Sequence, residues 1–125
     1  MSQSNALRMQ PSENVSWRAL CSRRDLVANS GVVAWLDDEQ VALFHLPETE
    51  TGEKVFAVAN KDPKSGANVI GRGILGQLKG DLVIASPLYK QHFRLQDGAC
   101  LEYPEQRLRV WAVRLKGEAV EIAVD

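Results

Sequence analysis

Short runs of apolar residues, each ended by turn-forming residues, recur along most of the chain. These runs predict β-strands over residues 17–20, 31–36, 40–46, 54–59, 81–85, 91–95, 107–115 and 119–124. No stretch keeps the period of a long helix, and only residues 22–26 predict a single helical turn. About eight short strands without a long helix predict an all-β barrel or sandwich of antiparallel strands.

Two of the predicted strands are apolar on both faces. In residues 54–59 the two-residue period of a strand separates two apolar sets, Val55, Ala57 and Ala59 on one face and Phe56 and Val58 on the other. Residues 82–85 are apolar throughout, which predicts a strand in the middle of a sheet. The core is therefore expected to lie on both sides of these strands.

The segments between the strands differ in character. Residues 37–39 and 116–118 predict the turns of two hairpins, and residues 47–53 predict a charged loop. Residues 60–80 are broken by a proline and several glycines, which predicts a long loop, and ordered loops of that length are often functional. Residues 1–16 are polar and aperiodic and predict a mobile leader before a single domain at 17–125.

Size and charge narrow the function classes. The chain has 125 residues and a net charge of −1, so it predicts one domain with little attraction for nucleic acid. The longest apolar stretch, residues 31–36, is too short to cross a membrane, and the polar start lacks a signal peptide, so we expect a cytoplasmic protein. The cysteines Cys21 and Cys100 are expected to be reduced and buried.

Charged residues are unevenly distributed along the sequence. Residues 37–53 carry six acidic and no basic residues, whereas residues 54–94 carry seven basic and two acidic ones. This pattern predicts either a polarised surface or two solvated loops that differ in sign.

A motif in residues 83–98, Val-Ile-Ala-Ser-Pro-Leu-Tyr-Lys-Gln-His-Phe-Arg-Leu-Gln-Asp-Gly, resembles the second cluster loop of a Rieske [2Fe–2S] domain. In a Rieske centre two cysteines bind one iron and two histidines bind the other, one of each from each loop. In this resemblance Ser86 and Tyr89 occupy the ligand positions of the second loop, and Asn60 and Asp62 those of the first. None of these four side chains supplies a thiolate or an imidazole, so the resemblance implies a Rieske-like barrel with two long tip loops and no metal or cofactor on this chain.

A narrower resemblance joins both loops. Residues 60–74 (Asn-Lys-Asp-Pro-Lys-Ser-Gly-Ala-Asn-Val-Ile-Gly-Arg-Gly-Ile) and 86–93 (Ser-Pro-Leu-Tyr-Lys-Gln-His-Phe) are similar to the small subunit of bacterial assimilatory NAD(P)H nitrite reductase. The resemblance implies a non-catalytic subunit of an oxidoreductase, with no active site on this chain alone. It also implies a large-subunit partner that holds FAD, siroheme and an iron–sulfur cluster and reduces nitrite to ammonium.

The two loops also supply a candidate docking surface. Basic and aromatic side chains gather in them, as in many protein interfaces, and the docking candidates are Lys61, Lys64, Tyr89, Lys90 and His92. The alternative interpretation is that Asp62-Pro63 and Ser86-Pro87 are ordinary turns.

Two other functions stay open from the sequence: a genuine Rieske-type electron-transfer ferredoxin and a stand-alone β-barrel interaction module. The glycine pattern at residues 71–76 fits a phosphate-binding motif only weakly, because no strand and helix flank it.

Overall fold

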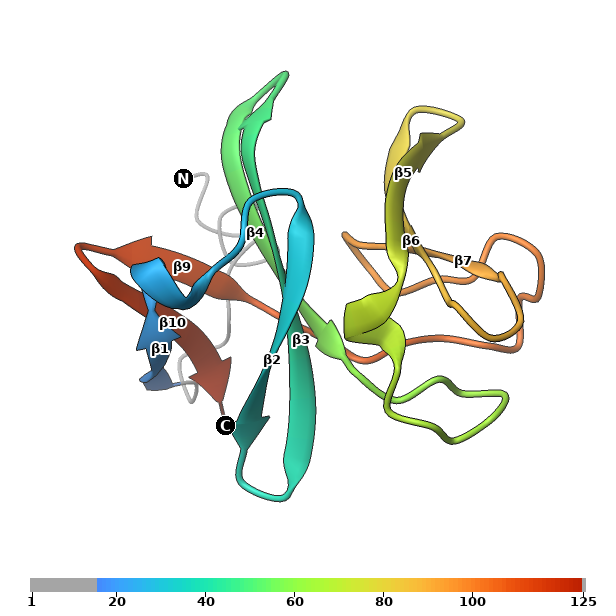
Figure 1. The fold of residues 1–125 in the computed structure, drawn as a ribbon, viewed down its shortest axis with the longest axis horizontal. Helices are drawn as coiled ribbons and strands as arrows, with labels where there is room; N and C mark the ends of the chain where they lie inside the picture. Colours follow the sequence, from blue (N-terminus) through green and yellow to red (C-terminus); the bar gives the residue numbers. More distant parts are fainter. Residues whose placement is uncertain (1–15, 125) are drawn as a thin grey trace, which may run out of the picture.

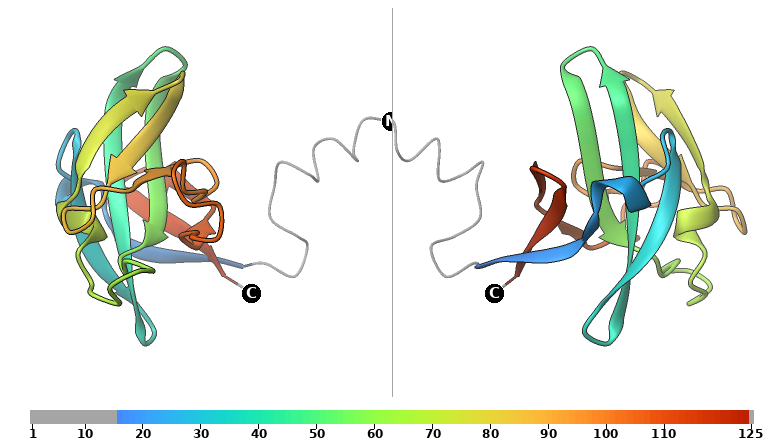
Figure 2. Two further views of the ribbon diagram at one scale, coloured as in Figure 1. Left: turned by 90° about the vertical axis from the view of Figure 1, so that its right-hand side faces the viewer. Right: turned by 60° about the vertical axis from the view of Figure 1, so that its left-hand side comes forward.

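The computed structural model describes residues 16–124, and these residues form an all-β structure, as predicted (Figures 1 and 2). Three antiparallel sheets make up the fold, and two short 3-10 turns interrupt them. The predicted leader lies outside the described residues, except that Ser16 already belongs to the first strand. No helix in the described part of the chain is long and apolar enough to cross a membrane.

The first sheet brings the two ends of the described chain together. Its strands follow the order β1-β10-β9, with bounds β1 Ser16–Ser22, β10 Ala119–Val124 and β9 Val113–Lys116. The predicted helical turn is the 3-10 turn η1 (Arg23–Asp25), which a capping box between Ser22 and Asp25 closes.

The second sheet is the centre of the molecule, in the order β2-β3-β4-β8. Its strands are β2 (Ser30–Leu36), β3 (Glu39–Thr49), β4 (Gly52–Ala59) and β8 (Val110–Trp111). The hairpin predicted around residues 37–39 is confirmed as the β2–β3 hairpin. The loop predicted at residues 47–53 is wrong for most of its length, because β3 continues to Thr49 and β4 begins at Gly52. Pro47 is tolerated there because the pairing shifts register between Leu46 and Thr49.

The third sheet is smaller and has the order β5-β6-β7. Its strands are β5 (Ile74–Leu78), β6 (Asp81–Ala85) and β7 (His92–Arg94), so the predicted central position of residues 82–85 is confirmed. Strand β5 lies inside the segment predicted as a long loop. The glycines of this segment favoured the loop prediction, but β5 and β6 form a hairpin. Its two turn residues, Lys79 and Gly80, both have positive φ, as a tight hairpin turn requires.

The predicted strand at residues 107–115 is divided between two sheets. Val110 and Trp111 of β8 pair with β4, whereas β9 pairs with β10. The pattern of apolar residues does not mark this change of sheet, because both pieces bury side chains.

The core lies on both faces of the β3–β4 hairpin. Val58 and the partly buried Phe56 join one cluster, centred on Phe44, Ile84 and Phe93. The opposite face of β4 joins a second cluster together with Leu43, Trp111 and Ile122. The two faces predicted for residues 54–59 are therefore confirmed, and they place one sheet on each side of β3 and β4.

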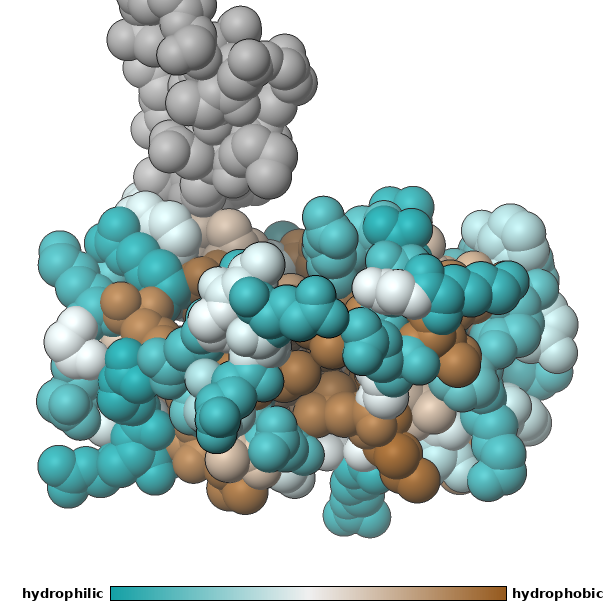
Figure 3. All heavy atoms as spheres, turned by 90° about the horizontal axis from the view of Figure 1, so that it is seen from above, coloured by the Kyte–Doolittle hydropathy of each residue, from teal (hydrophilic) through white to brown (hydrophobic). Residues whose placement is uncertain are grey.

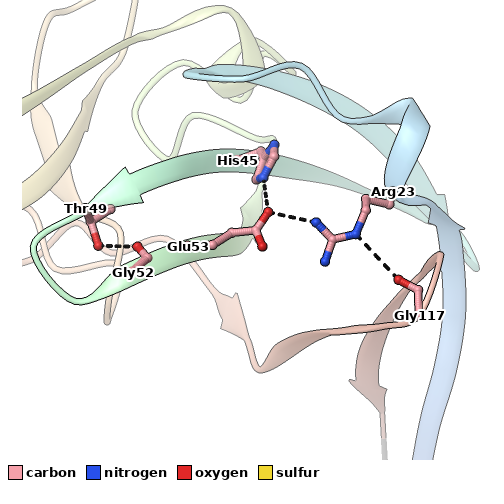
Figure 4. A network of polar contacts seen from close by, with 6 residues as sticks. All are labelled: Arg23, His45, Thr49, Gly52, Glu53 and Gly117. Atoms are coloured by element: carbon pink, nitrogen blue, oxygen red, sulfur yellow. Dashed lines mark hydrogen bonds and ion pairs between the residues drawn. The ribbon is translucent and has the colours of Figure 1, made fainter.

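A polar network joins the first sheet and the η1 turn to the second, central sheet (Figure 4). Glu53 of β4 accepts a hydrogen bond from Arg23, with 2.8 Å between Nη1 and Oε2, and its Oε2 lies 2.7 Å from Nε2 of His45. Nε of Arg23 also lies 3.5 Å from the carbonyl oxygen of Gly117, in the β9–β10 turn. These contacts join three separate segments of the sequence.

Two hairpins flank a groove at one end of the molecule. The β3–β4 and β5–β6 turns lie on the same side in Figures 1 and 2. Between the two hairpins are adjoining hollows of about 570, 480 and 360 Å³ whose walls include Leu46, Phe56 and Leu82. Figure 3, which views this end from above, shows hydrophobic atoms between hydrophilic rims. The loops that follow β4 and β6 leave from the other end of these strands.

Candidate functional site

Three loops meet at the end of the molecule opposite the hairpin turns. We call them the first tip loop (residues 60–69), the second tip loop (residues 86–91) and the third tip loop (residues 101–106). The first follows β4 and the second follows β6, and these strands run in directions that deliver both loops to the same end (Figure 1). The sequence predicted the first two loops as a pair, and hydrogen bonds between them confirm that they meet.

Asp62 is the centre of the site. Its side chain is fully buried, although a carboxylate is seldom buried without partners. Four donors surround it. The backbone N–H groups of Lys64 and Ser65 donate to Oδ1 at 2.8 and 3.1 Å, the Ser86 hydroxyl donates to Oδ2, and the Gln91 amide donates to Oδ1 at 3.3 Å. The charge is therefore held by groups from both loops.

Ser86 and Gln91 are the buried polar residues of the second tip loop. The Ser86 N–H donates to the Gln91 carbonyl at 2.9 Å, and the Ser86 carbonyl accepts from the Lys90 N–H at 3.0 Å. These bonds close the loop and turn both side chains inward. The side-chain amide of Gln91 also donates to Oε1 of Gln106, at 3.0 Å, so it links the second loop to the third.

Asn60 fixes the start of the first tip loop. Its Oδ1 accepts a hydrogen bond from the N–H of Gly71 at 2.6 Å, and its Nδ2 donates to Oε1 of Gln40 at 2.9 Å. Gly71 belongs to the 3-10 turn η2 (Ile70–Arg72) and has no room for a side chain, because a Cβ there would lie 2.9 Å from Val33 and 3.2 Å from Oδ1 of Asn60. Asn60 thus occupies its buried position as a backbone anchor.

Tyr89 differs from the other three predicted ligand positions. Its side chain is 52% exposed, and the ammonium of Lys64 lies 4.8 Å from the centroid of its ring. Lys61 and Lys90 are also exposed, and Leu88 beside them is 49% exposed. The structure therefore places Lys64 and Tyr89 together on an accessible surface, and it exposes Lys61 and Lys90 in the same two loops.

His92 lies farther in than the other docking candidates. It is half-buried, and its Nδ1 lies 2.6 Å from Oε2 of Glu102 in the third tip loop. Partial burial favours the protonated form of Glu102, but the backbone N–H and the ring of His92 outweigh it and lower the pKa of this carboxyl. His92 thus contributes to the contact between β7 and the third tip loop more than to the exposed surface.

The third tip loop was missed in the sequence. Gln106 reaches Gln91 of the second loop, and Glu102 reaches His92 at the start of β7, through tertiary contacts that no local spacing signals. Cys100, just before this loop, is buried, and burial raises the pKa of its thiol. Cys21 is also a free thiol but is only half-buried, so the prediction that both cysteines are buried holds for Cys100 alone.

The donor set does not fit an iron–sulfur cluster. Asn60, Asp62 and Ser86 are engaged in hydrogen bonds, and Tyr89 points its ring to the surface beside Lys64. Within residues 16–124, no group of three or more His, Cys, Asp or Glu side chains is placed to hold a metal ion. The tip therefore consists of hydrogen-bonded buried side chains beneath a surface that exposes several lysines.

The comparisons with known proteins agree with this geometry. The Rieske-like [2Fe-2S] domain family matches residues 16–123. The small subunit of NADH nitrite reductase from Escherichia coli K12 is 38% identical to this chain over 106 residues, which span 85% of this chain and 95% of that protein. The chain belongs to the Rieske-like family of nitrite reductase small subunits.

Solved structures place this small-subunit family within the Rieske fold. The nitrite reductase [NAD(P)H] small subunit of Erwinia carotovora is 37% identical, with a TM-score of 0.72 over 87% of this chain and 82% of that one. The ferredoxin of carbazole 1,9a-dioxygenase from Nocardioides aromaticivorans shares the fold at 18% identity, with a TM-score of 0.71 over 88% of this chain and 99% of that one.

A third relative is a large subunit. The nitrite reductase [NAD(P)H] large subunit of Klebsiella oxytoca is 38% identical over 104 residues, which span 83% of this chain and 10% of that protein. A segment similar to this small subunit is therefore part of the same polypeptide as a large subunit in that organism.

Proposed function

We propose that this chain is the non-catalytic small subunit of a cytoplasmic NAD(P)H nitrite reductase and that it binds the large subunit through its tip loops. The chemistry of nitrite reduction then belongs to the large subunit, with FAD, siroheme and an iron–sulfur cluster, and this chain holds no cofactor. The single observation that carries the proposal is the 38% identity to small subunits over 95% of their length.

The Klebsiella protein supports the choice of partner. A domain that is covalently joined to a large subunit in one organism has a high effective concentration beside it, so even a weak contact between them persists. A separate chain of the same family must reach the same association through its own surface. The proposal therefore requires a built docking surface on this chain.

The tip surface has the composition of such an interface. Tyr89 and Leu88 are exposed apolar groups, the ammonium of Lys64 lies over the Tyr89 ring, and Lys61 and Lys90 are exposed in the same two loops. Aromatic anchors surrounded by polar groups are typical of interface hot spots. The complementary surface on the large subunit would be acidic around an apolar pocket.

The test is NAD(P)H-dependent formation of ammonium from nitrite by the purified large subunit, with and without a saturating amount of this chain. We expect the rate to rise on addition. The variant Tyr89→Ala with Lys90→Ala should weaken the affinity for the large subunit by about tenfold or more, as loss of interface hot spots does.

A matched control is Leu78→Ser, which changes an exposed apolar side chain on β5 near the far end of the molecule. It should bind the large subunit like the unmodified chain. If Leu78→Ser weakens binding and the Tyr89 and Lys90 variant does not, the docking surface is the hairpin end and the tip proposal is wrong. No change in rate and no complex would instead favour a stand-alone interaction module.

A further inference from the structure

The buried carboxylate of Asp62 has a task that docking alone does not explain. A carboxylate removed from water costs free energy unless it is fully hydrogen-bonded, and a turn could be made without one. Two of its four donors, the N–H groups of Lys64 and Ser65, belong to its own loop. The other two, Ser86 and Gln91, belong to the second tip loop.

These contacts are the junction between the first two tip loops. The backbone hydrogen bonds of the first loop stay within it, run to its flanks, as in Ile70 to Asn60, or reach the carbonyl of Gln40 in β3 from the N–H of Asn60. Those of the second loop join Ser86 with Lys90 and Gln91. Within residues 16–124, every hydrogen bond between these two loops ends on the carboxylate of Asp62.

In a Rieske domain the cluster joins the same two loops, because each loop supplies ligands to it. In this chain Asp62 and Ser86 stand at one such position in each loop and bond directly to each other. We propose that the Asp62 carboxylate and its hydrogen bond to Ser86 replace the cluster as the cross-link between the tip loops and fix the tip surface before any partner binds. The second half of this proposal rests on the proposed function.

A carboxylate suits this role better than its amide counterpart. An ionised carboxylate only accepts hydrogen bonds and has room for about four donors, which is the number that Asp62 receives. An asparagine would turn one oxygen into a donor that faces other donors. Fixing a binding loop in advance removes part of the ordering cost of association, so the cross-link should strengthen binding without touching the partner.

The cross-link itself is tested on the full chain alone, by amide hydrogen exchange. Ser86→Ala removes the hydroxyl that bridges the loops. The matched control Ser65→Ala removes a hydroxyl whose one hydrogen bond within residues 16–124, from the N–H of Ala67, stays in the first loop. Ser86→Ala should speed exchange of the Lys64 and Ser65 amides by about tenfold, because the carboxylate that protects them loses its anchor. Ser65→Ala should leave the Lys64 amide unchanged. Unchanged exchange in Ser86→Ala, with Asp62→Asn also like the unmodified chain, would overturn the cross-link.

The effect on docking is tested by affinity for the large subunit. Ser86 is buried and cannot touch a partner, yet Ser86→Ala should weaken binding by about tenfold. Tyr89→Ala should also weaken binding, but it should not change amide exchange at Lys64 and Ser65. A double variant of Asp62→Asn and Ser86→Ala should bind no more weakly than Asp62→Asn alone, since both changes cut the same link.

Two results separate this inference from the proposed function. If Tyr89→Ala weakens binding while Ser86→Ala changes only the exchange rates, the cross-link exists but the tip docks without needing it, and the second half of the inference is wrong. If neither variant affects binding, docking through the tip is wrong, and only the exchange data on the isolated chain still support the cross-link.

Discussion

The ammonium of Lys64 lies 4.8 Å from the centroid of the Tyr89 ring, so the two tip loops touch at the surface as well as at the buried Asp62. A lysine ammonium over an aromatic face is attracted by the ring quadrupole, whose negative side is the face of the ring. This contact lies within the surface that we propose for docking. It also leaves the positive charge of Lys64 exposed to a partner.

This surface predicts an association that is sensitive to salt. Exposed Lys61, Lys64 and Lys90 contribute three positive charges, the Asp62 carboxylate beneath them is buried, and Asp38 and Glu39 line a hollow with Lys61. Raising the salt from about 50 to about 500 mM should weaken binding to the large subunit, because ions screen charges at this spacing. The triple variant with glutamine at these lysines should bind more weakly at low salt and respond less to added salt. Titration calorimetry at both salt concentrations measures the effect, and equal salt dependence of the two proteins would contradict it.

The sequence predicted most of the fold because its signals are local. The alternation in residues 54–59 and the apolar run at 82–85 both record burial on a pleated strand, and the structure confirms both. Strand β5 escaped prediction because Gly73, Gly76 and Gly80 resemble a loop, although Gly80 only closes a tight turn. Residues 47–53, which begin with Pro47, were wrongly predicted as a loop. Strand β3 continues through Pro47 because the register shift there removes the penalty for the missing N–H.

The candidate site was predictable only in part. Asn60, Asp62, Ser86 and Tyr89 were found through a resemblance, and the structure divides them into three buried residues and one exposed residue. That division depends on which side chains face inward after the chain folds. Gln106 lies 15 residues from Gln91 and joins the site through a single amide contact, which no sequence spacing encodes.

The network in Figure 4 predicts a specific loss of stability in acid. Hydrogen bonds from His45 and Arg23 lower the pKa of the Glu53 carboxyl below its ordinary value of 4.5. When the pKa of a carboxyl is lower in the folded chain than in the unfolded chain, its ionised form stabilises the fold. That stability is fully present above the unfolded pKa and is lost as the pH falls through the folded pKa. Glu53→Gln should therefore be less stable than the unmodified chain at about pH 6, and the difference should shrink toward about pH 3.

Thermal unfolding across this pH range measures the difference. The control is Glu50→Gln, which changes an exposed acid in the adjacent turn for which no ion pair is observed within residues 16–124. Glu50→Gln should follow the unmodified chain at every pH. A gap between Glu53→Gln and the unmodified chain that stays constant with pH would contradict the assignment to Glu53.

Two glycines with the same backbone conformation predict different costs of substitution. Gly98 has a φ of +79° and Gly80 a φ of +83°, so alanine is strained at both. At Gly80 the new Cβ meets no atom of residues 16–124 within 4 Å, whereas at Gly98 it meets the carbonyl group of Leu108, with the carbon 2.9 Å away. Gly80→Ala should cost about 1 kcal/mol, the penalty of the left-handed conformation alone. Gly98→Ala should cost about 3 kcal/mol or more, because the backbone must also move. Urea unfolding compares the two, and equal costs would contradict the close approach of Leu108.

The composition of the tip predicts that the purified chain carries no iron–sulfur cluster. Thiolate and imidazole ligands hold the Rieske cluster, and Asn60, Asp62, Ser86 and Tyr89 stand where the resemblance puts those ligands. The free cysteines Cys21 and Cys100 lie elsewhere, and Cys100 is buried before the third tip loop.

The chain should therefore be colourless after expression with added iron, without acid-labile sulfide and without a visible absorption band. A Rieske ferredoxin expressed and purified in the same way is the control, and it should be coloured. Stoichiometric iron and sulfide in this chain would show that other side chains hold a cluster. This result would contradict the hydrogen-bonded cross-link at Asp62 and favour a metal centre at the tip. Asp62 would be a metal ligand in the first alternative and a hydrogen-bond acceptor in the second, so the variant Asp62→Asn decides between them. Loss of iron in this variant would favour the metal centre. Faster exchange of the Lys64 amide, in a protein without iron, would favour the cross-link.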